Sequence, residues 1–119
     1  MRSGFKVIIV AAVGALNYRL LDEKLNLLIE ESGCYAFYIF SGYVNGEKSK
    51  YTRLASKWAK ENGCPVIKIL ENSEEKLLDR MILKADYAIF ILDGDPLINN
   101  IFMRYKMSGK HGSVIRKNV

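Results

Sequence analysis

The stretch YIFSGYVNGEKSKYTRLASKWAKENGCPV (Tyr38–Val66) joins the end of a predicted strand to a glycine-bearing segment, a helix and the start of another strand. The apolar run at residues 35–40 is rich in aromatic side chains, which favour strands. Apolar and small residues then recur at the three- and four-residue spacing of one helix face. This face comprises Tyr51, Leu54, Ala55, Trp58, Ala59 and Asn62. Gly63 follows, where a left-handed residue commonly ends a helix, so the stretch predicts a β-α-β unit.

The same alternation extends through the whole chain. The predicted strands are residues 6–12, 35–40, 65–70 and 87–92 and a short edge strand near Val114. One predicted helix runs from near Asn17 to Gly33, and the second carries the face just described. Asn72 with Glu75 forms a predicted capping pair for a third helix, whose apolar stripe is Leu78, Met81 and Ile82. A fourth helix is predicted from the helical spacing of Ile98, Ile101, Phe102 and Tyr105. Strict alternation predicts an α/β fold in one domain over residues 1–119. We expect a three-layer, Rossmann-like, doubly wound parallel sheet of about five strands with helices on both faces.

The composition limits the class of protein. Half of the 119 residues are hydrophobic, which is sufficient for one folded domain and argues against disorder. No apolar run reaches the roughly 20 residues of a membrane-spanning helix, and no signal-peptide pattern is evident, so we expect a cytoplasmic protein without a membrane partner. Cys34 and Cys64 are expected to be reduced thiols. With His111 as the single histidine, we predict no zinc site, no Ser-His-Asp triad and no cofactor.

The net charge of +5 is concentrated near the end of the sequence, where no acidic residue follows Asp95. This basic region fits either an anionic partner or a solvated helix face and tail. Nucleic acid is the less favoured partner, because many basic proteins never meet it. Four tyrosines fit a stacking surface or a homo-oligomer interface, but core or half-buried positions are favoured for each. They are Tyr38, Tyr43, Tyr51 and Tyr105.

Ligands of doubly wound sheets bind beyond the carboxyl ends of the strands, where the strand order reverses. The segments expected there are AAVGALN, SGYVNGEKSK, ENSEE and DGDPLINN. The second combines small residues with lysines before a helix start, which suits a phosphate. Its Ser-Gly and Asn-Gly pairs equally suit plain turns. Asp93 fits either a contact to a ribose hydroxyl or a turn with Gly94, and the turn is slightly favoured.

FSGYVNG and RLASKWAKENGCPV, followed by ADYAIFILDG, resemble the SLOG superfamily. This Rossmann-like group includes DNA-processing proteins of the DprA/Smf type, LOG-type phosphoribohydrolases and small stand-alone bacterial and phage members. The resemblance is closest to the stand-alone members and covers most of the chain. It aligns Ser41, Gly42 and Gly46 with small residues of the motif and Asp93 with an acidic turn. Thr52 stands where the motif has an aspartate.

Most polar site residues of the catalytic relatives are replaced, so the resemblance implies the fold more than an activity. The leading hypothesis is a non-catalytic or weakly catalytic domain that binds a nucleotide-like or other phosphorylated small molecule. The candidate ligand-binding residues are Gly14, Ser41, Gly42, Asn45, Gly46, Lys48, Thr52, Arg53, Asp93 and Gly94. No catalytic residue is assigned.

Two alternatives remain open. FILDGDPLIN also resembles nucleoside deoxyribosyltransferases, which suggests hydrolysis or transfer at an N-glycosidic bond, with Asp93 or Asp95 as the carboxylate. The other alternative is a decayed scaffold that acts as a nucleic-acid- or protein-interaction module.

Overall fold

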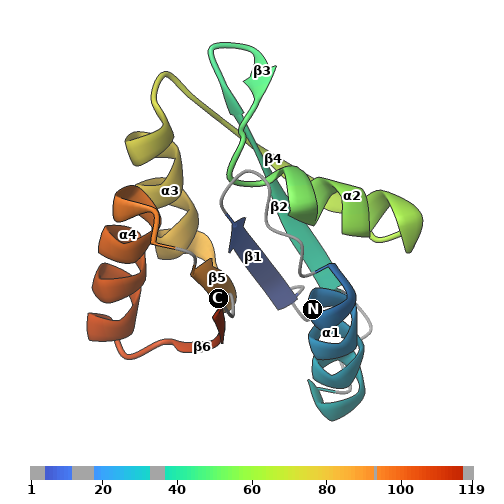
Figure 1. The fold of residues 1–119 in the computed structure, drawn as a ribbon. Helices are drawn as coiled ribbons and strands as arrows, with labels where there is room; N and C mark the ends of the chain where they lie inside the picture. Colours follow the sequence, from blue (N-terminus) through green and yellow to red (C-terminus); the bar gives the residue numbers. More distant parts are fainter. Residues whose placement is uncertain (1–4, 12–17, 33–36, 93, 117–119) are drawn as a thin grey trace.

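The computed structural model describes residues 5–11, 18–32, 37–92 and 94–116 (Figure 1). The strands are β1 (Phe5–Ala11), β2 (Phe37–Val44), β3 (Glu47–Lys48), β4 (Val66–Glu71), β5 (Tyr87–Leu92) and β6 (His111–Arg116). The helices are α1 (Tyr18–Ser32), α2 (Arg53–Glu61), α3 (Glu74–Lys84) and α4 (Pro96–Met107). The predicted alternation of strands and helices is confirmed, with β3 as an additional short strand.

The sheet has the connectivity of a doubly wound fold. β2 pairs in parallel with β1 and β4, β1 pairs with β5, and β5 pairs with β6. The chain therefore moves outward from β1 to β4 and then returns to build the other half of the sheet from β5. The order reverses between β1 and β5, and β6 lies at the sheet edge as predicted. The Rossmann-like α/β fold class is confirmed.

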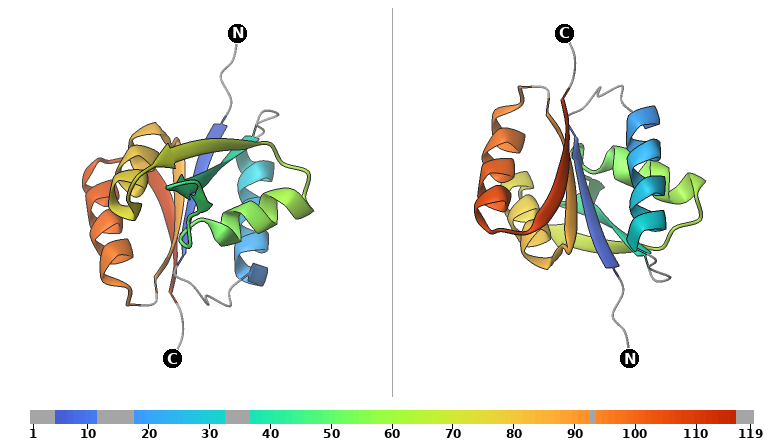
Figure 2. Two further views of the ribbon diagram at one scale, coloured as in Figure 1. Left: turned by 90° about the horizontal axis from the view of Figure 1, so that it is seen from above. Right: turned by 90° about the horizontal axis from the view of Figure 1, so that it is seen from below.

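The central strand β1 shows why the sheet is covered on both faces. Ile8 and Val10 belong to the cluster of buried residues that includes the apolar faces of α3 and α4. Val7 and Ile9 belong to the cluster beneath α1 and α2. Because successive side chains of a strand point to opposite faces, a continuous apolar run requires cover on both sides. Figure 2 shows the two helix pairs on opposite sides of the sheet.

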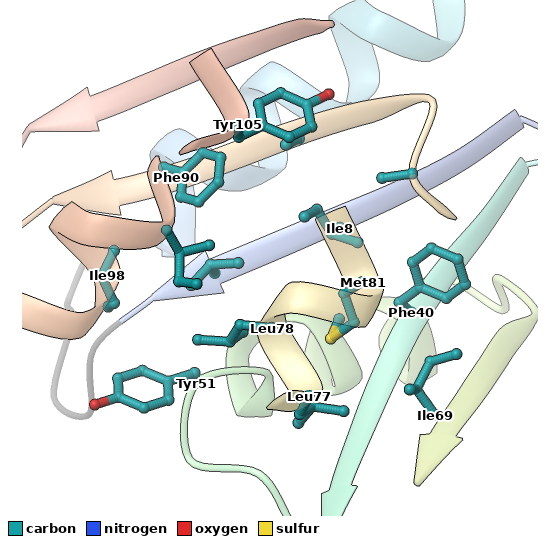
Figure 3. Close-up of a cluster of buried hydrophobic side chains, with 14 of the residues drawn as sticks. Ile8, Phe40, Tyr51, Ile69, Leu77, Leu78, Met81, Phe90, Ile98 and Tyr105 are labelled. Carbon is teal, nitrogen blue, oxygen red and sulfur yellow. The ribbon is translucent and has the colours of Figure 1, made fainter. Parts of the chain in front are cut away.

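The cluster beneath α3 and α4 is built mainly from large apolar side chains. Leu77, Leu78 and Met81 of α3 are fully buried. Figure 3 shows Leu78 and Met81 among side chains that come from the strands and from α4. Tyr51 lies at one end of this cluster, close to Ile98 at the beginning of α4 (Figure 3). The carboxyl edge of the sheet is therefore partly filled by an aromatic side chain.

The prediction that a loop follows residue 40 is wrong, because β2 continues to Val44. The registers Ser41–Lys68 through Val44–Glu71 continue the parallel pairing with β4. Asn45 (φ 52°) and Gly46 (φ 83°) then form a tight turn into the antiparallel strand β3. Positive φ at both central residues is the requirement of the hairpin turn that Asn-Gly favours. Long-range pairing with β4 thus extends the strand through a Ser-Gly pair that locally resembles a turn.

The cap of α3 also differs from the sequence prediction. Ser73, rather than Asn72, is the N-cap of α3, and its hydroxyl accepts a hydrogen bond from the Lys76 amide at 3.2 Å. Asp95 caps α4, which begins at Pro96 and carries the predicted apolar stripe from Ile98 to Tyr105. Its carboxylate accepts from two amides of the first turn. Gly63 has φ 62° and directly follows Asn62, the C-cap residue of α2, as the sequence predicted.

Within the described residues, no helix has both the length and the apolar character required to cross a membrane.

Candidate functional site

The segment that we predicted to cradle a phosphate uses its backbone groups internally. The Gly42 amide donates to the Thr52 hydroxyl at 3.0 Å, and the Gly42 carbonyl accepts from the Ser49 amide at 2.8 Å. The Asn45 amide donates to the Glu71 carbonyl at 3.0 Å. The expectation that amides between residues 41 and 46 open toward a ligand is therefore wrong for Gly42 and Asn45.

Gly42 allows β2 to pack closely against α3. A Cβ atom built on Gly42 would lie 2.4 Å from Cδ2 of Leu77, a fully buried side chain of α3. Such a distance is far below van der Waals contact, so a side chain here would displace Leu77. Gly46, by contrast, is exposed, and a Cβ atom placed on it would meet open space. Its φ of 83° explains why a glycine stands there.

The polar residues that surround Gly42 form a buried network. Ser41 and Thr52 are 3% and 1% exposed. The hydroxyls of Ser41 and Ser56 lie 2.8 Å apart, and the Ser56 hydroxyl also donates to the Thr52 carbonyl at 3.1 Å. Buried hydroxyls that find such partners stabilise the fold rather than present themselves to solvent. The role of Ser41 and Thr52 seen here is to attach the start of α2 to β2.

The predicted convergence of the segments after β2 and β5 is observed at one contact. The Tyr51 hydroxyl donates to Oδ2 of Asp95 at 3.1 Å, while Oδ1 of Asp95 accepts from the amides of Leu97 and Ile98 at 2.9 and 3.2 Å. The Ser49 hydroxyl also donates to the Glu74 carboxylate at 2.6 Å, at the start of α3. The Asp95 carboxylate is thus engaged as a helix cap.

Two of the predicted site residues, Gly14 and Asp93, lie outside the described residues. Gly94, which follows Asp93, is exposed and has φ 99°. This backbone conformation explains a glycine there without a ligand.

The two remaining candidates, Lys48 and Arg53, line a surface depression of about 630 Å³ over α2. We call it the basic hollow, and its lining residues are Lys48, Arg53, Ser56, Lys57, Lys60 and Glu61. Four cations and one carboxylate therefore surround a single depression. Because the four cations outnumber the carboxylate, the basic hollow has a positive potential.

Helical geometry brings three of these cations together. Arg53, Lys57 and Lys60 stand at positions i, i+4 and i+7, which lie along one face of α2. The opposite face of α2 packs against the sheet through Trp58, which is 1% exposed, and two buried alanines. The Trp58 indole N–H donates to Oδ1 of Asp22 on α1 at 2.8 Å. Packing and this bond fix the orientation of the cationic face.

Tyr18 of α1 contacts the far end of the basic hollow. Its hydroxyl donates to the carboxylate of Glu61, and the Lys57 ammonium lies 4.8 Å from the centre of its ring. Desolvation, together with this hydrogen bond and the negative charges of Glu61 and Asp22, raises the pKa of Tyr18 to about 12. Tyr18 is therefore a neutral hydrogen-bond donor at physiological pH.

The N-terminus of α2 opens beside the hollow. Thr52 is the N-cap residue, but its side chain makes no capping bond because its hydroxyl is directed to β2. The partial positive charge at a helix N-terminus acts over the first turn, next to Arg53. Lys48, from β3, completes the cationic group from outside the helix.

Sequence reasoning found Lys48 and Arg53 but missed Ser56, Lys57 and Lys60. The detectable signal was the spacing of the cations on one helix face. Among the described residues, no group of three His, Cys, Asp or Glu side chains could hold a metal ion.

The comparison with protein-family models finds no match, and the comparison with curated proteins finds none either. The resemblance to the SLOG superfamily therefore stays a prediction.

Proposed function

We propose that this protein is a non-catalytic or weakly catalytic domain that binds a nucleotide-like or other phosphorylated small molecule in the basic hollow. One observation carries the proposal: Lys48, Arg53, Lys57 and Lys60 line one depression beside the start of a helix. Arginine and lysine are the usual partners of phosphate, and a helix N-terminus adds to their field.

The size of the hollow favours a small ligand. Ligand pockets commonly occupy about 300–1,000 Å³, and the basic hollow, at about 630 Å³, lies within this range. The Ser56 hydroxyl provides a neutral hydrogen-bonding group within the cationic lining. Its bond to the Thr52 carbonyl leaves the oxygen lone pairs as acceptors, one of which faces the Ser41 hydroxyl.

A phosphate-dependent binding assay tests the proposal. AMP, ADP-ribose and inorganic phosphate are compared with adenosine, which has no phosphate, by thermal shift and calorimetry. A phosphorylated ligand at 100 times its dissociation constant should stabilise the fold by about 2.7 kcal/mol. If no phosphorylated ligand raises the melting temperature at millimolar concentration, or if adenosine binds equally well, the proposal fails.

Matched variants locate the site. Replacing Arg53 and Lys57 by glutamine should weaken binding at least tenfold, equivalent to about 1.4 kcal/mol. Replacing Lys24 and Lys84 by glutamine removes the same charge from exposed positions outside the basic hollow and should leave the affinity unchanged. Equal weakening by both pairs would indicate attraction by net charge alone.

Two further measurements separate the alternatives. Release of free base from AMP, measured by chromatography, would indicate N-glycosidic hydrolysis. Binding of a single-stranded oligonucleotide more tightly than AMP, with a steep salt dependence, would instead indicate a nucleic-acid interaction module.

A further inference from the structure

A second depression lies between α4 and the edge strand β6, on the sheet face opposite α2. Its volume is about 320 Å³. We call it the aromatic hollow, because Phe90, Phe102 and Tyr105 contribute to its lining together with Val114. We propose that the aromatic hollow binds a small aromatic carboxylate, with Lys106 as the partner of the carboxylate group.

The aromatic residues are arranged as a packed unit. The rings of Phe90 and Phe102 meet edge to face at 5.3 Å between centroids, and Phe90 and Tyr105 are tilted at 5.6 Å. Phe90 and Tyr105 are 1% and 3% exposed, whereas Phe102 is half-buried. A ligand ring that reaches Phe102 would extend this set of aromatic contacts.

The wall formed by β6 is held against α4. A Cβ atom on Gly112 would lie 2.8 Å from the Ala88 carbonyl and 3.1 Å from Cε2 of Tyr105, so only glycine permits this approach. The Tyr105 hydroxyl donates to the carbonyl of His111 at the start of β6. The hollow is therefore formed by the packing of the fold, and a ligand need not order it.

The charges around the aromatic hollow indicate which charged group its ligand should carry. Of its two lysines, Lys110 is already engaged, since its ammonium donates to the carbonyls of Ile82, Leu83 and Ala85 at 2.8–3.1 Å. The side chain of Lys106 is exposed, and its ammonium makes no hydrogen bond or ion pair with any described residue. No carboxylate occurs among the described lining residues. An apolar body with one negative group therefore complements the aromatic hollow.

The volume limits the ligand further. At about 320 Å³, the aromatic hollow stands at the lower end of the range for ligand pockets. One or two fused rings with a carboxylate fit within this space, and the largely aromatic lining suits them better than the sugar and phosphate of a nucleotide. The proposed ligand class thus differs from that of the basic hollow.

Two-dimensional ¹H–¹⁵N NMR with 2-naphthoate and the uncharged 2-naphthylmethanol tests the proposal. We expect both to shift amide signals of residues 102–114, with the carboxylate binding more tightly. Lys106→Gln should weaken 2-naphthoate about fivefold, as for an exposed ion pair, and leave 2-naphthylmethanol unchanged. Lys84→Gln, with the same charge change outside the aromatic hollow, should affect neither ligand.

A second variant tests the cavity itself. Val114→Trp should fill the hollow and abolish the binding of both ligands, with the folded state verified from the dispersion of the remaining signals. The Lys106→Gln comparison decides the assignment even if Val114→Trp does not fold. The proposal is overturned if 5 mM 2-naphthoate shifts no signal in residues 102–114, or if Lys106→Gln leaves its affinity unchanged. It is also overturned if these signals shift with protein concentration alone, because the aromatic hollow would then bind a second copy of the protein.

Discussion

Replacing Thr52 by valine should destabilise the protein although the two side chains have nearly the same shape. The Thr52 hydroxyl accepts the Gly42 amide at 3.0 Å, and Thr52 is 1% exposed. Valine would leave that amide without its acceptor in the buried network, which costs about 1–3 kcal/mol. The helix cap adds little, because the Thr52 side chain makes no capping bond to α2.

The expected change in melting temperature follows from the chain length. Unfolding entropy of about 2.1 cal/mol/K per residue gives about 0.25 kcal/mol/K for 119 residues. A loss of about 2 kcal/mol thus lowers the melting temperature by about 8 °C. Thr52→Ser keeps the hydroxyl and removes one methyl group, at about 1 kcal/mol, so it should lower the melting temperature by about half as much.

Thermal unfolding followed by circular dichroism measures both variants, and hydrogen exchange identifies the group affected. Exchange of the Gly42 amide should accelerate in Thr52→Val and stay close to wild type in Thr52→Ser. If Thr52→Val melts within 2 °C of the wild type, or melts above Thr52→Ser, the Gly42 amide does not depend on this hydroxyl. Residues 41–52 would then not form the internally satisfied network described above.

Three further variants, two of them with a matched control variant, test other contacts. Lys110→Met removes the ammonium from the last carbonyls of α3 and should cost about 1 kcal/mol in urea unfolding. Lys84→Met, at an exposed position, should cost less than about 0.5 kcal/mol, and equal losses would contradict the assignment. Burial, with the charges of neighbouring groups, raises the pKa of Tyr105 to about 12. An unfolded tyrosine ionises near pH 10. The contribution of the neutral Tyr105 side chain to the unfolding free energy is therefore complete below pH 10 and is lost as the pH rises to about 12. Tyr105→Phe should therefore reduce the fall in unfolding free energy between about pH 10 and 11.5, and an unchanged slope would exclude this cause. Leu78→Ala in the core should cost about 2–5 kcal/mol. Leu83→Ala, at a side chain 77% exposed, should change stability by less than about 0.5 kcal/mol, and a similar cost for both would contradict the observed burial.

The fold could be predicted because each strand and helix carries its own pattern. The apolar run at residues 6–12 predicted a strand covered on both faces, and β1 is buried in this way. Gly63 correctly marked the end of α2. Such signals arise from local geometry and from burial, both of which the sequence records directly.

The end of β2 could not be predicted from local residues alone. Ser41 and Gly42 resemble a turn, but they pair with Lys68 and Ile69 of a strand that lies far along the chain. Asn45–Gly46 did contain the hairpin signal. The long-range pairing overrode the local preference, and it removed the amides that a phosphate cradle would need.

The candidate site was predicted only in part for a similar reason. Lys48 and Arg53 were found because they flank the glycine-bearing segment, whereas Lys57 and Lys60 continue along the exposed face of a helix. Exposed lysines on a helix usually have no partner, so their pattern alone did not distinguish a site. Their convergence with Lys48 depends on the position of β3, which the sequence did not indicate.

Along one edge of β2, the neighbouring strand changes from β1 to β3, and this change divides the sheet. β1 pairs with β2 only as far as Val7 and Ile39, and β3 occupies the same edge of β2 at residues 43–44. Beyond Val7 and Ile39, the half of the sheet that contains β2 and the half that contains β1 and β5 are joined by side chains such as Tyr51 instead of a backbone ladder. A backbone ladder resists shear more strongly than side-chain contacts do, so the carboxyl end of the sheet is the place where the halves can most easily splay apart.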